Sequence, residues 1–297
     1  MLAYAALAIT LFAASYGPIT IREAQAEGVP SVVIIAARLW LSVLILTPAV
    51  WRQSRAGAEF GRMTRRHWGY LLIAGTFFAI NLLALFFALE YTTVLMVGIM
   101  RRTGSLWMIL LEISILGAAF SRRVWIGLIL AVVGSILVAL SSALTGGNQL
   151  DWGATPVLGA AIAAGGALAM SLYMLIGRAM RNVLSTFTYS WLIFIVSAVL
   201  TTLLALYLGL PLTGYTRTAV YLVLWVTFIT QILGHVPINY SLQHFPATYV
   251  SVTMQGAVVL MAIFALLAFR EIPTTPEIIG SVIIAAGIFI ATFRSSS

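Results

Sequence analysis

Two stretches of the chain share a pattern that decides the fold: RVWIGLILAVVG at residues 123–134 and PEIIGSVIIAAG at residues 276–287. Both stretches are apolar, and each contains two glycines that lie seven residues apart. These are Gly127 and Gly134 in the first stretch, and Gly280 and Gly287 in the second. The pattern is that of an apolar helix with small residues on one face, which favours close helix packing either within the bundle or between chains.

The offset of 153 that superimposes these stretches aligns residues 1–144 with residues 154–297 without a gap. Self-similarity at a fixed offset is the mark of a structural repeat. We therefore predict two similar halves, residues 1–144 and 154–297, joined by the polar, Gly-rich residues 145–153 as an external linker.

The composition excludes a water-soluble fold. Of the 297 residues, 62% are hydrophobic and 8% charged, whereas soluble domains carry about 25% charged residues. The apolar residues form blocks of about 20, the length that crosses a bilayer as a helix. The blocks are residues 2–20, 30–51, 68–89, 93–119, 124–144, 154–176, 185–208, 219–241, 247–269 and 275–293.

Five blocks in each half is an odd number, so the second half must enter the membrane from the opposite face. The predicted fold class is an all-α polytopic membrane protein with ten transmembrane helices arranged as two inverted five-helix repeats. Inverted repeats can pack around a midplane site that opens to each side in turn.

The 16 basic residues are all Arg, and their positions argue for a membrane protein rather than a nucleic-acid partner despite the net charge of +8. Ten lie in connectors or at the chain end on one predicted side, against three, namely Arg22, Arg217 and Arg270, on the other. Positive charge marks the cytoplasmic side. We predict a multi-pass protein of the bacterial inner membrane with both termini in the cytoplasm.

Four motifs resemble those of a known family. They are AARLWLS at residues 36–42, FALEYTT at 87–93, INYSLQHFPA at 238–247 and FREIP at 269–273, the last followed by IIG and AGI. Their order and spacing resemble the drug/metabolite transporter superfamily, in particular its EamA-type ten-span branch. The resemblance implies a substrate carrier, not an enzyme, with a central cavity walled by spans 1 to 4 and 6 to 9.

The sequence departs from that family pattern at two places. Ala118 stands where the second half has Glu271, and the fourth predicted span lacks an opening Pro but carries Met100-Arg-Arg-Thr103.

Three arginines, Arg38, Arg101 and Arg102, fall at membrane depth. A charge there costs about 2.5–3.5 kcal/mol, so each needs a partner or a task. A guanidinium fork suits capture of carboxylate or phosphate, so we predict that Arg101 or Arg102 binds an anionic group of the substrate. The alternative is an internal salt bridge to Glu90 or Glu112. Arg38 has two alternative roles: it binds the substrate, or it is a buried residue that holds helices together.

A polar stripe is predicted on the eighth span, where Thr227, Gln231, His235 and Asn239 recur at steps of four. The matching third-span positions Ala74, Phe78, Leu82 and Phe86 are apolar, so the two faces predict an amphipathic cavity. Interhelical hydrogen bonding is the alternative role of such a stripe. Further cavity candidates are Tyr16, Asn81, Ser171 and Gln255, and Glu112 is the candidate for proton coupling.

These features predict a secondary transporter, an exporter or exchanger, that moves a small polar metabolite with an anionic group, such as an amino acid or organic acid, by alternating access. The alternatives are a membrane-embedded enzyme such as a transferase, or an exchanger of sugar phosphates or nucleotide sugars. The chain has no HExxH motif and only three His, which disfavours an enzyme. No catalytic residue, metal or cofactor is expected. The expected partners are the substrate and the lipid bilayer, and the chain is expected to be a monomer or homodimer.

Overall fold

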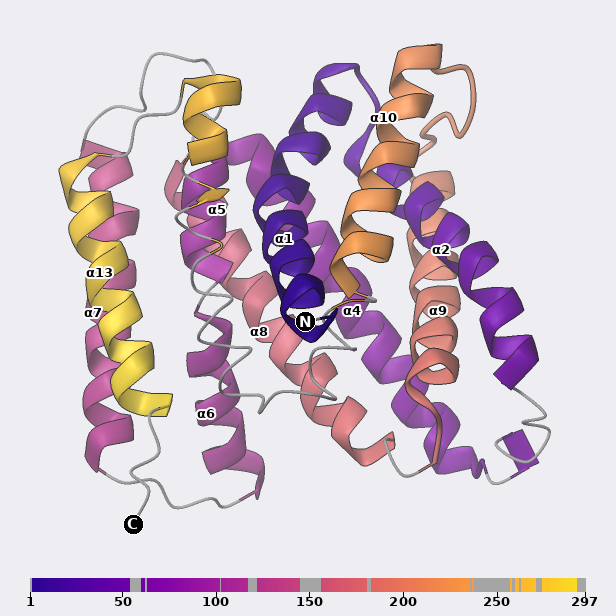
Figure 1. Ribbon diagram of the computed structural model, residues 1–297, viewed down its shortest axis with the longest axis horizontal. Coiled ribbons are helices and arrows are strands. Elements are labelled where there is room, and N and C mark those ends of the chain that lie inside the picture. Colours follow the sequence, from indigo (N-terminus) through magenta and orange to yellow (C-terminus); the bar gives the residue numbers. More distant parts are fainter. Residues whose placement is uncertain are drawn as a thin grey trace.

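The computed structural model describes residues 2–53, 60–61, 63–101, 103–116, 122–144, 156–180, 183–235, 237, 257, 260–261, 263–270 and 274–292. Every regular element within these ranges is helical, as expected (Figure 1). The helices are α1 Leu2–Ala26, α2 Ser31–Gln53, α4 Arg65–Tyr91, α5 Val94–Arg101, α6 Gly104–Leu116, α7 Arg122–Leu144, α8 Pro156–Met180, α9 Thr186–Tyr207, α10 Arg217–Thr227, the π-helix η1 Phe228–His235, and α13 Thr275–Thr292.

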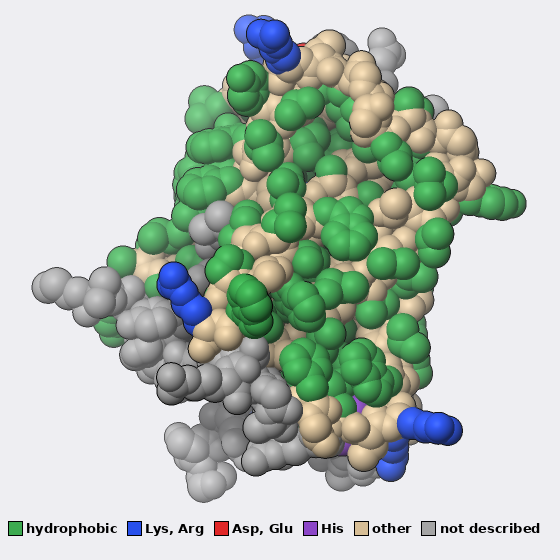
Figure 2. Space-filling model, turned by 90° about the vertical axis from the view of Figure 1, so that its right-hand side faces the viewer, with side chains coloured by type: hydrophobic (Ala, Val, Ile, Leu, Met, Phe, Trp, Pro, Cys, Tyr) green, Lys and Arg blue, Asp and Glu red, His purple; other side chains and the backbone are tan. Residues whose placement is uncertain are grey.

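Five of these helices, α1, α2, α4, α8 and α9, are long and apolar enough to cross a membrane. Shorter apolar helical stretches occupy Trp125–Gly134, Arg217–Thr230 and Thr275–Gly287. Hydrophobic side chains cover the broad middle of the face drawn in Figure 2, and arginines project from its upper and lower ends and from one edge. A helical, membrane-embedded fold is therefore confirmed, and the total of ten spans stays a prediction.

The helices pack in pairs, and adding or subtracting 153 from the residue numbers of one pair gives the residues of an equivalent pair. α4 packs against α8, and at the equivalent positions η1 and α10 pack against α1. The pairs α2 with α9 and α7 with α13 each join a helix to its own counterpart (Figure 1). This exchange of contacts is what two similar halves related by a pseudo-two-fold axis produce.

Glycines let the paired helices approach closely. A Cβ added at Gly134 of α7 would lie 2.8 Å from the carbonyl oxygen of Gly280 on α13. A Cβ at Gly166 of α8 would lie 2.7 Å from the Cβ of Ala84 on α4. Because lipid supplies no hydrophobic drive for helix association, close backbone packing through small residues stabilises the pairs. The close packing predicted for the glycine stretches of α7 and α13 occurs within the chain.

The predicted fourth span, residues 93–119, is not one helix. α5 ends at Arg101 and α6 begins at Gly104, with Thr103 in a turn between them. The Thr103 hydroxyl donates to the carbonyl oxygen of Met100 at 2.7 Å, and such a side-chain bond competes with the helical ladder. A break at membrane depth is tolerated where protein or a polar cavity surrounds it.

The eighth predicted span, residues 219–241, also differs from a regular α-helix. It continues from α10 into η1, where the backbone changes to π geometry. π segments are rare and frequently occur at functional sites. The predicted polar stripe crosses this change, with Thr227 at the end of α10 and Gln231 and His235 on η1.

Two adjacent glycines of α8 test the helix packing. Gly166→Ala places a methyl against Ala84 of α4 and should lower the free energy of unfolding by about 1–3 kcal/mol. Gly165, its neighbour, has nothing within 4 Å of an added Cβ, so Gly165→Ala should be neutral or stabilising by up to about 1 kcal/mol. The measurement is denaturant unfolding in mixed micelles. Equal effects of the two variants would contradict the packing described here.

Candidate substrate site

Arg38 of α2 is buried in the helical bundle, with 3% of its surface exposed. Its guanidinium carbon lies 6.0 Å from the centre of the Phe86 ring on α4. Among the residues that the structure describes, its Nε and Nη1 atoms have no hydrogen-bond partner. A buried cation without polar partners is costly in a helical bundle, so this side chain is not explained as a tie between helices.

Arg101, the last residue of α5, reaches the same stretch of α4 as Arg38. Its Nη1 donates to the Oδ1 atom of Asn81 at 3.1 Å. Asn81 is itself buried on α4, with 2% of its surface exposed. Three helices thus converge on one place, which we call the arginine site: Arg38, Asn81, Phe86 and Arg101.

No carboxylate among the described side chains pairs with Arg101. Glu90, one of the two predicted partners, is exposed at the end of α4 and accepts a hydrogen bond from the Ser31 hydroxyl. The other, Glu112, lies on α6, and its side chain is outside the described residues. Glu112 is eight residues beyond Gly104, or about 12 Å along α6 from the start of that helix. A single neutral amide is therefore the protein partner of this guanidinium in the described part of the chain.

The break in the fourth span places further polar groups near Arg101. α6 begins at Gly104, so the partial positive charge of its N-terminus lies three residues along the chain from Arg101. The Gly104 carbonyl is not free, because the Ser171 hydroxyl of α8 donates to it at 2.8 Å. The predicted cavity residue Ser171 therefore anchors the break to α8.

An aromatic cluster adjoins the arginine site on α4. Phe78 lies one turn before Asn81, and its ring centre is 5.1 Å from Tyr173 and 5.5 Å from Phe194. The ring of Tyr189 stacks on Tyr173 at 6.0 Å. Three helices, α4, α8 and α9, contribute these rings. The cluster gives the site an apolar wall toward the Arg65 end of α4.

The remaining predicted residues are not placed in this site. Tyr16 of α1 stacks on Phe12 at 5.6 Å and meets Phe264 edge-on at 5.7 Å, in a separate aromatic group. Gln231 and His235 lie on η1, with side chains outside the described residues. Arg102, Asn239 and Gln255 lie outside the described residues altogether. The cavity role of the eighth-span stripe stays a prediction.

Arg22 is a buried arginine that the sequence reasoning missed. It was assigned to an external connector, but α1 continues through it, and 1% of its surface is exposed. Its Nη2 atom donates to the carbonyl oxygens of Leu89, at 3.0 Å, and Thr92, at the end of α4. The guanidinium also lies 5.4 Å from the Phe269 ring centre. Arg22 directly follows the first apolar block. The only signal that the helix continues past this block is the lack of a turn residue before Gly28.

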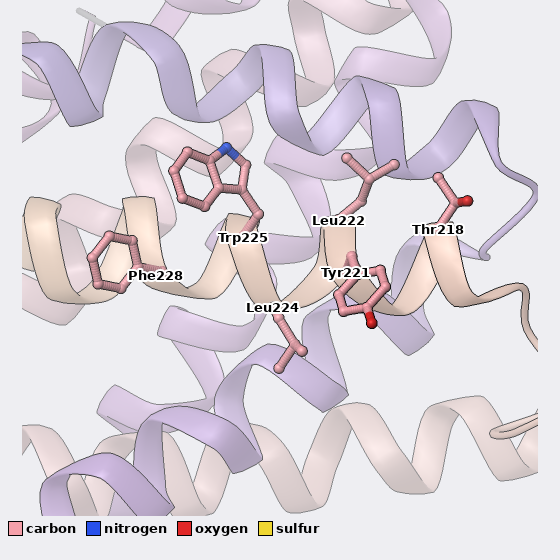
Figure 3. A pocket seen from close by; sticks show the side chains of 6 residues that line it. All are labelled: Thr218, Tyr221, Leu222, Leu224, Trp225 and Phe228. Atoms are coloured by element: carbon pink, nitrogen blue, oxygen red, sulfur yellow. The ribbon is translucent and has the colours of Figure 1, made fainter.

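A surface hollow along α10 is separate from the arginine site. All of its lining side chains are uncharged, and several are broadly exposed (Figure 3). They are Thr218, Tyr221, Leu222, Leu224, Trp225 and Phe228. An exposed apolar surface of this kind suits contact with lipid chains.

Fold and site together define a polytopic helical membrane protein with buried cations inside its bundle. The chain belongs to the EamA-like transporter family, whose model matches residues 1–140 and again residues 157–293. The protein is therefore a membrane transporter of the drug/metabolite type, and the resemblance inferred from the four motifs is confirmed. The two matches fall one in each predicted half.

Solved structures agree on the fold. One described as "Crystal structure of protein" is similar over 97% of this chain and 96% of its own, with 19% identity and a TM-score of 0.62. At that identity the likeness concerns the fold alone. No curated protein matches the chain.

Arg22 is expected to hold the end of α4 in place. Arg22→Gln removes the cation from two helix-terminal carbonyls and should lower the free energy of unfolding by about 1.5–3 kcal/mol, the value of hydrogen bonds to a charged group. Arg66→Gln is the control, since Arg66 is exposed and contacts only Tyr70 among the described residues. Thermal unfolding in detergent measures both. An Arg22 variant as stable as the control would contradict the role.

Proposed function

We propose that the protein is a secondary transporter, an exporter or exchanger, that moves a small polar metabolite by alternating access and binds its anionic group at the arginine site. The observation that carries the proposal is the buried guanidinium of Arg38, which has polar atoms without partners in the described structure. A bound anion supplies the hydrogen-bond acceptors and the negative charge that the described part of the protein does not provide for this guanidinium. Intramembrane charges of this kind mark substrate pathways.

The surroundings of the site support substrate binding. Asn81 orients Arg101 through a neutral hydrogen bond, which leaves the positive charge available. The aromatic cluster excludes water on one side and lowers the local dielectric, so a charge-assisted bond there is stronger than in water. A few polar groups in an apolar setting are the usual composition of a small-molecule site.

Alternating access follows from the proposed architecture. Ten spans in two inverted halves, with both termini in the cytoplasm, would surround the arginine site and open it to each side of the bacterial inner membrane in turn. The discontinuity between α5 and α6 supports this reading, since broken helices commonly form transporter binding sites. Glu112 stays the candidate for proton coupling, and Gln231, His235 and Asn239 for hydrogen bonds to the rest of the substrate.

Transport by reconstituted protein tests the proposal. Proteoliposomes should take up at least one member of a panel of amino acids, organic acids and sugar phosphates. Arg101→Gln should reduce that uptake at least about tenfold, because loss of a charge-assisted bond costs about 1.5–3 kcal/mol. Arg66→Gln, on the exposed surface, should transport normally. Uptake by the Arg101 variant at the control rate would exclude the arginine site as the substrate site.

Stability measurements separate a substrate ligand from a structural tie at Arg38. Arg38→Met removes a buried charge that lacks protein partners, so the substrate-free protein should gain about 1–3 kcal/mol in free energy of unfolding. Substrate should stabilise this variant against heat less than it stabilises the wild-type protein. A structural tie predicts the opposite, a loss of stability with substrate stabilisation retained, and thermal denaturation with and without substrate distinguishes the two.

A further inference from the structure

We infer that the substrate carries two negative charges, as a dicarboxylate or a phosphate monoester does, and is not an amino acid. The inference rests on the proposed function and narrows it. The site brings two guanidinium groups to one stretch of α4, Arg101 at Asn81 and Arg38 beside Phe86, five residues further on. In the described part of the structure, their only hydrogen-bond partner is the neutral amide of Asn81.

Three of the acidic side chains that the structure describes accept hydrogen bonds of their own. Glu27 accepts a hydrogen bond from Thr216 at 3.3 Å, and Glu277 accepts one from the Thr274 backbone at 2.7 Å. Glu90 accepts one from Ser31. Each of these contacts lies at the end of a helix, and Glu90, one turn beyond Phe86, is exposed.

Four further acids, Glu23, Glu59, Asp151 and Glu271, are assigned by sequence to connectors or the end of a span. Glu23, whose side chain is described, lies on α1 and interacts with Tyr16, which belongs to the separate aromatic group. The remaining acid, Glu112, lies on α6 about two helical turns beyond Gly104, and its side chain is outside the described residues. The chain therefore offers no carboxylate whose described position neutralises either guanidinium.

Charge balance then selects the ligand. A monocarboxylate neutralises one guanidinium and leaves the other buried and unpaired, next to a like charge that disfavours it. A dianion pairs with both cations and removes their repulsion. An amino acid at neutral pH adds an ammonium group, which repels both arginines and finds no carboxylate among the described side chains of the site.

The geometry of guanidinium groups suits either kind of dianion. A planar fork binds a carboxylate through two parallel hydrogen bonds, and binds phosphate oxygens in the same way. Arg38 comes from α2 and Arg101 from α5, so the two forks approach from different helices. Each guanidinium can bind one carboxylate of a dicarboxylate, or the two guanidinium groups can bind different oxygens of one phosphate.

Two matched ligand pairs test the charge requirement. Succinate is compared with succinamate, in which an amide replaces one carboxylate, and glycerol 3-phosphate with its methyl diester, at pH 8. Binding is measured by thermal stabilisation of the full-length protein, and transport by counterflow in proteoliposomes. In at least one pair the dianion should bind at least tenfold more tightly than its monoanion. The pair that shows the preference identifies the carboxylate or the phosphate form.

Arg38→Met provides the matched protein control. With one guanidinium left, it should bind the dianion and the monoanion of the preferred pair within about threefold of each other, while Arg66→Gln keeps the wild-type preference. Equal binding within both pairs by the wild-type protein, or no binding of any of the four ligands, overturns the inference. Uptake of alanine that Arg101→Gln abolishes would also overturn it, but would leave the proposed transport function standing.

Discussion

The placement of two guanidinium groups inside an apolar helical bundle, Arg38 buried and Arg101 partly buried, is the constraint on which the rest of the structure depends. A single charge at membrane depth costs about 2.5–3.5 kcal/mol even on a lenient scale, and two adjacent cations add their mutual repulsion. The bundle must be held together strongly enough elsewhere to retain them. An arrangement that is unfavourable without a ligand is informative about the ligand, because selection for stability alone would have replaced it with apolar side chains.

α4 is the helix that contacts both arginines and holds them in the bundle. It carries Asn81, which binds Arg101, and Phe86, whose ring lies beside Arg38. Its tight contact with α8 relies on Gly166, which admits Ala84 at close range. Its final carbonyls are held by Arg22 of α1. Packing beside Asn81 and at the C-terminal end of this long helix thus holds Asn81 and Phe86 in place.

The sequence predicted those features that depend on local pattern or on register. The glycines of residues 123–134 and 276–287 predicted close packing, and Gly134 does lie against Gly280. The apolar blocks predicted the long helices, because block length and hydrophobicity are local properties. The break after Arg101 was not predicted, since residues 93–119 read as one continuous apolar block and Thr103 terminates α5 through a side-chain bond.

The convergence of Arg38, Asn81 and Arg101 was beyond sequence reasoning for a different reason. The three lie on three helices, and each was a candidate singly, but nothing in a single sequence reports which helix faces meet. Arg22 shows the converse error. A block boundary placed at residue 20 assigned it to a connector, although α1 extends to Ala26. Helix ends are the least certain part of such a prediction.

The pseudo-symmetry of the chain sharpens what the arginine site implies. The offset of 153 places Arg38, Asn81 and Arg101 opposite Trp191, Gly234 and Met254, none of which is charged. The four residues of the arginine site thus come from the first half, while Tyr173, Tyr189 and Phe194 of the second half contribute to the adjoining aromatic cluster. Under the proposed mechanism, the first half keeps its hold on the anion while the second half moves against it. This movement closes the site to one side of the membrane and opens it to the other, and the anion stays paired with the arginines. The cations are therefore not exposed to lipid without a partner while the substrate crosses.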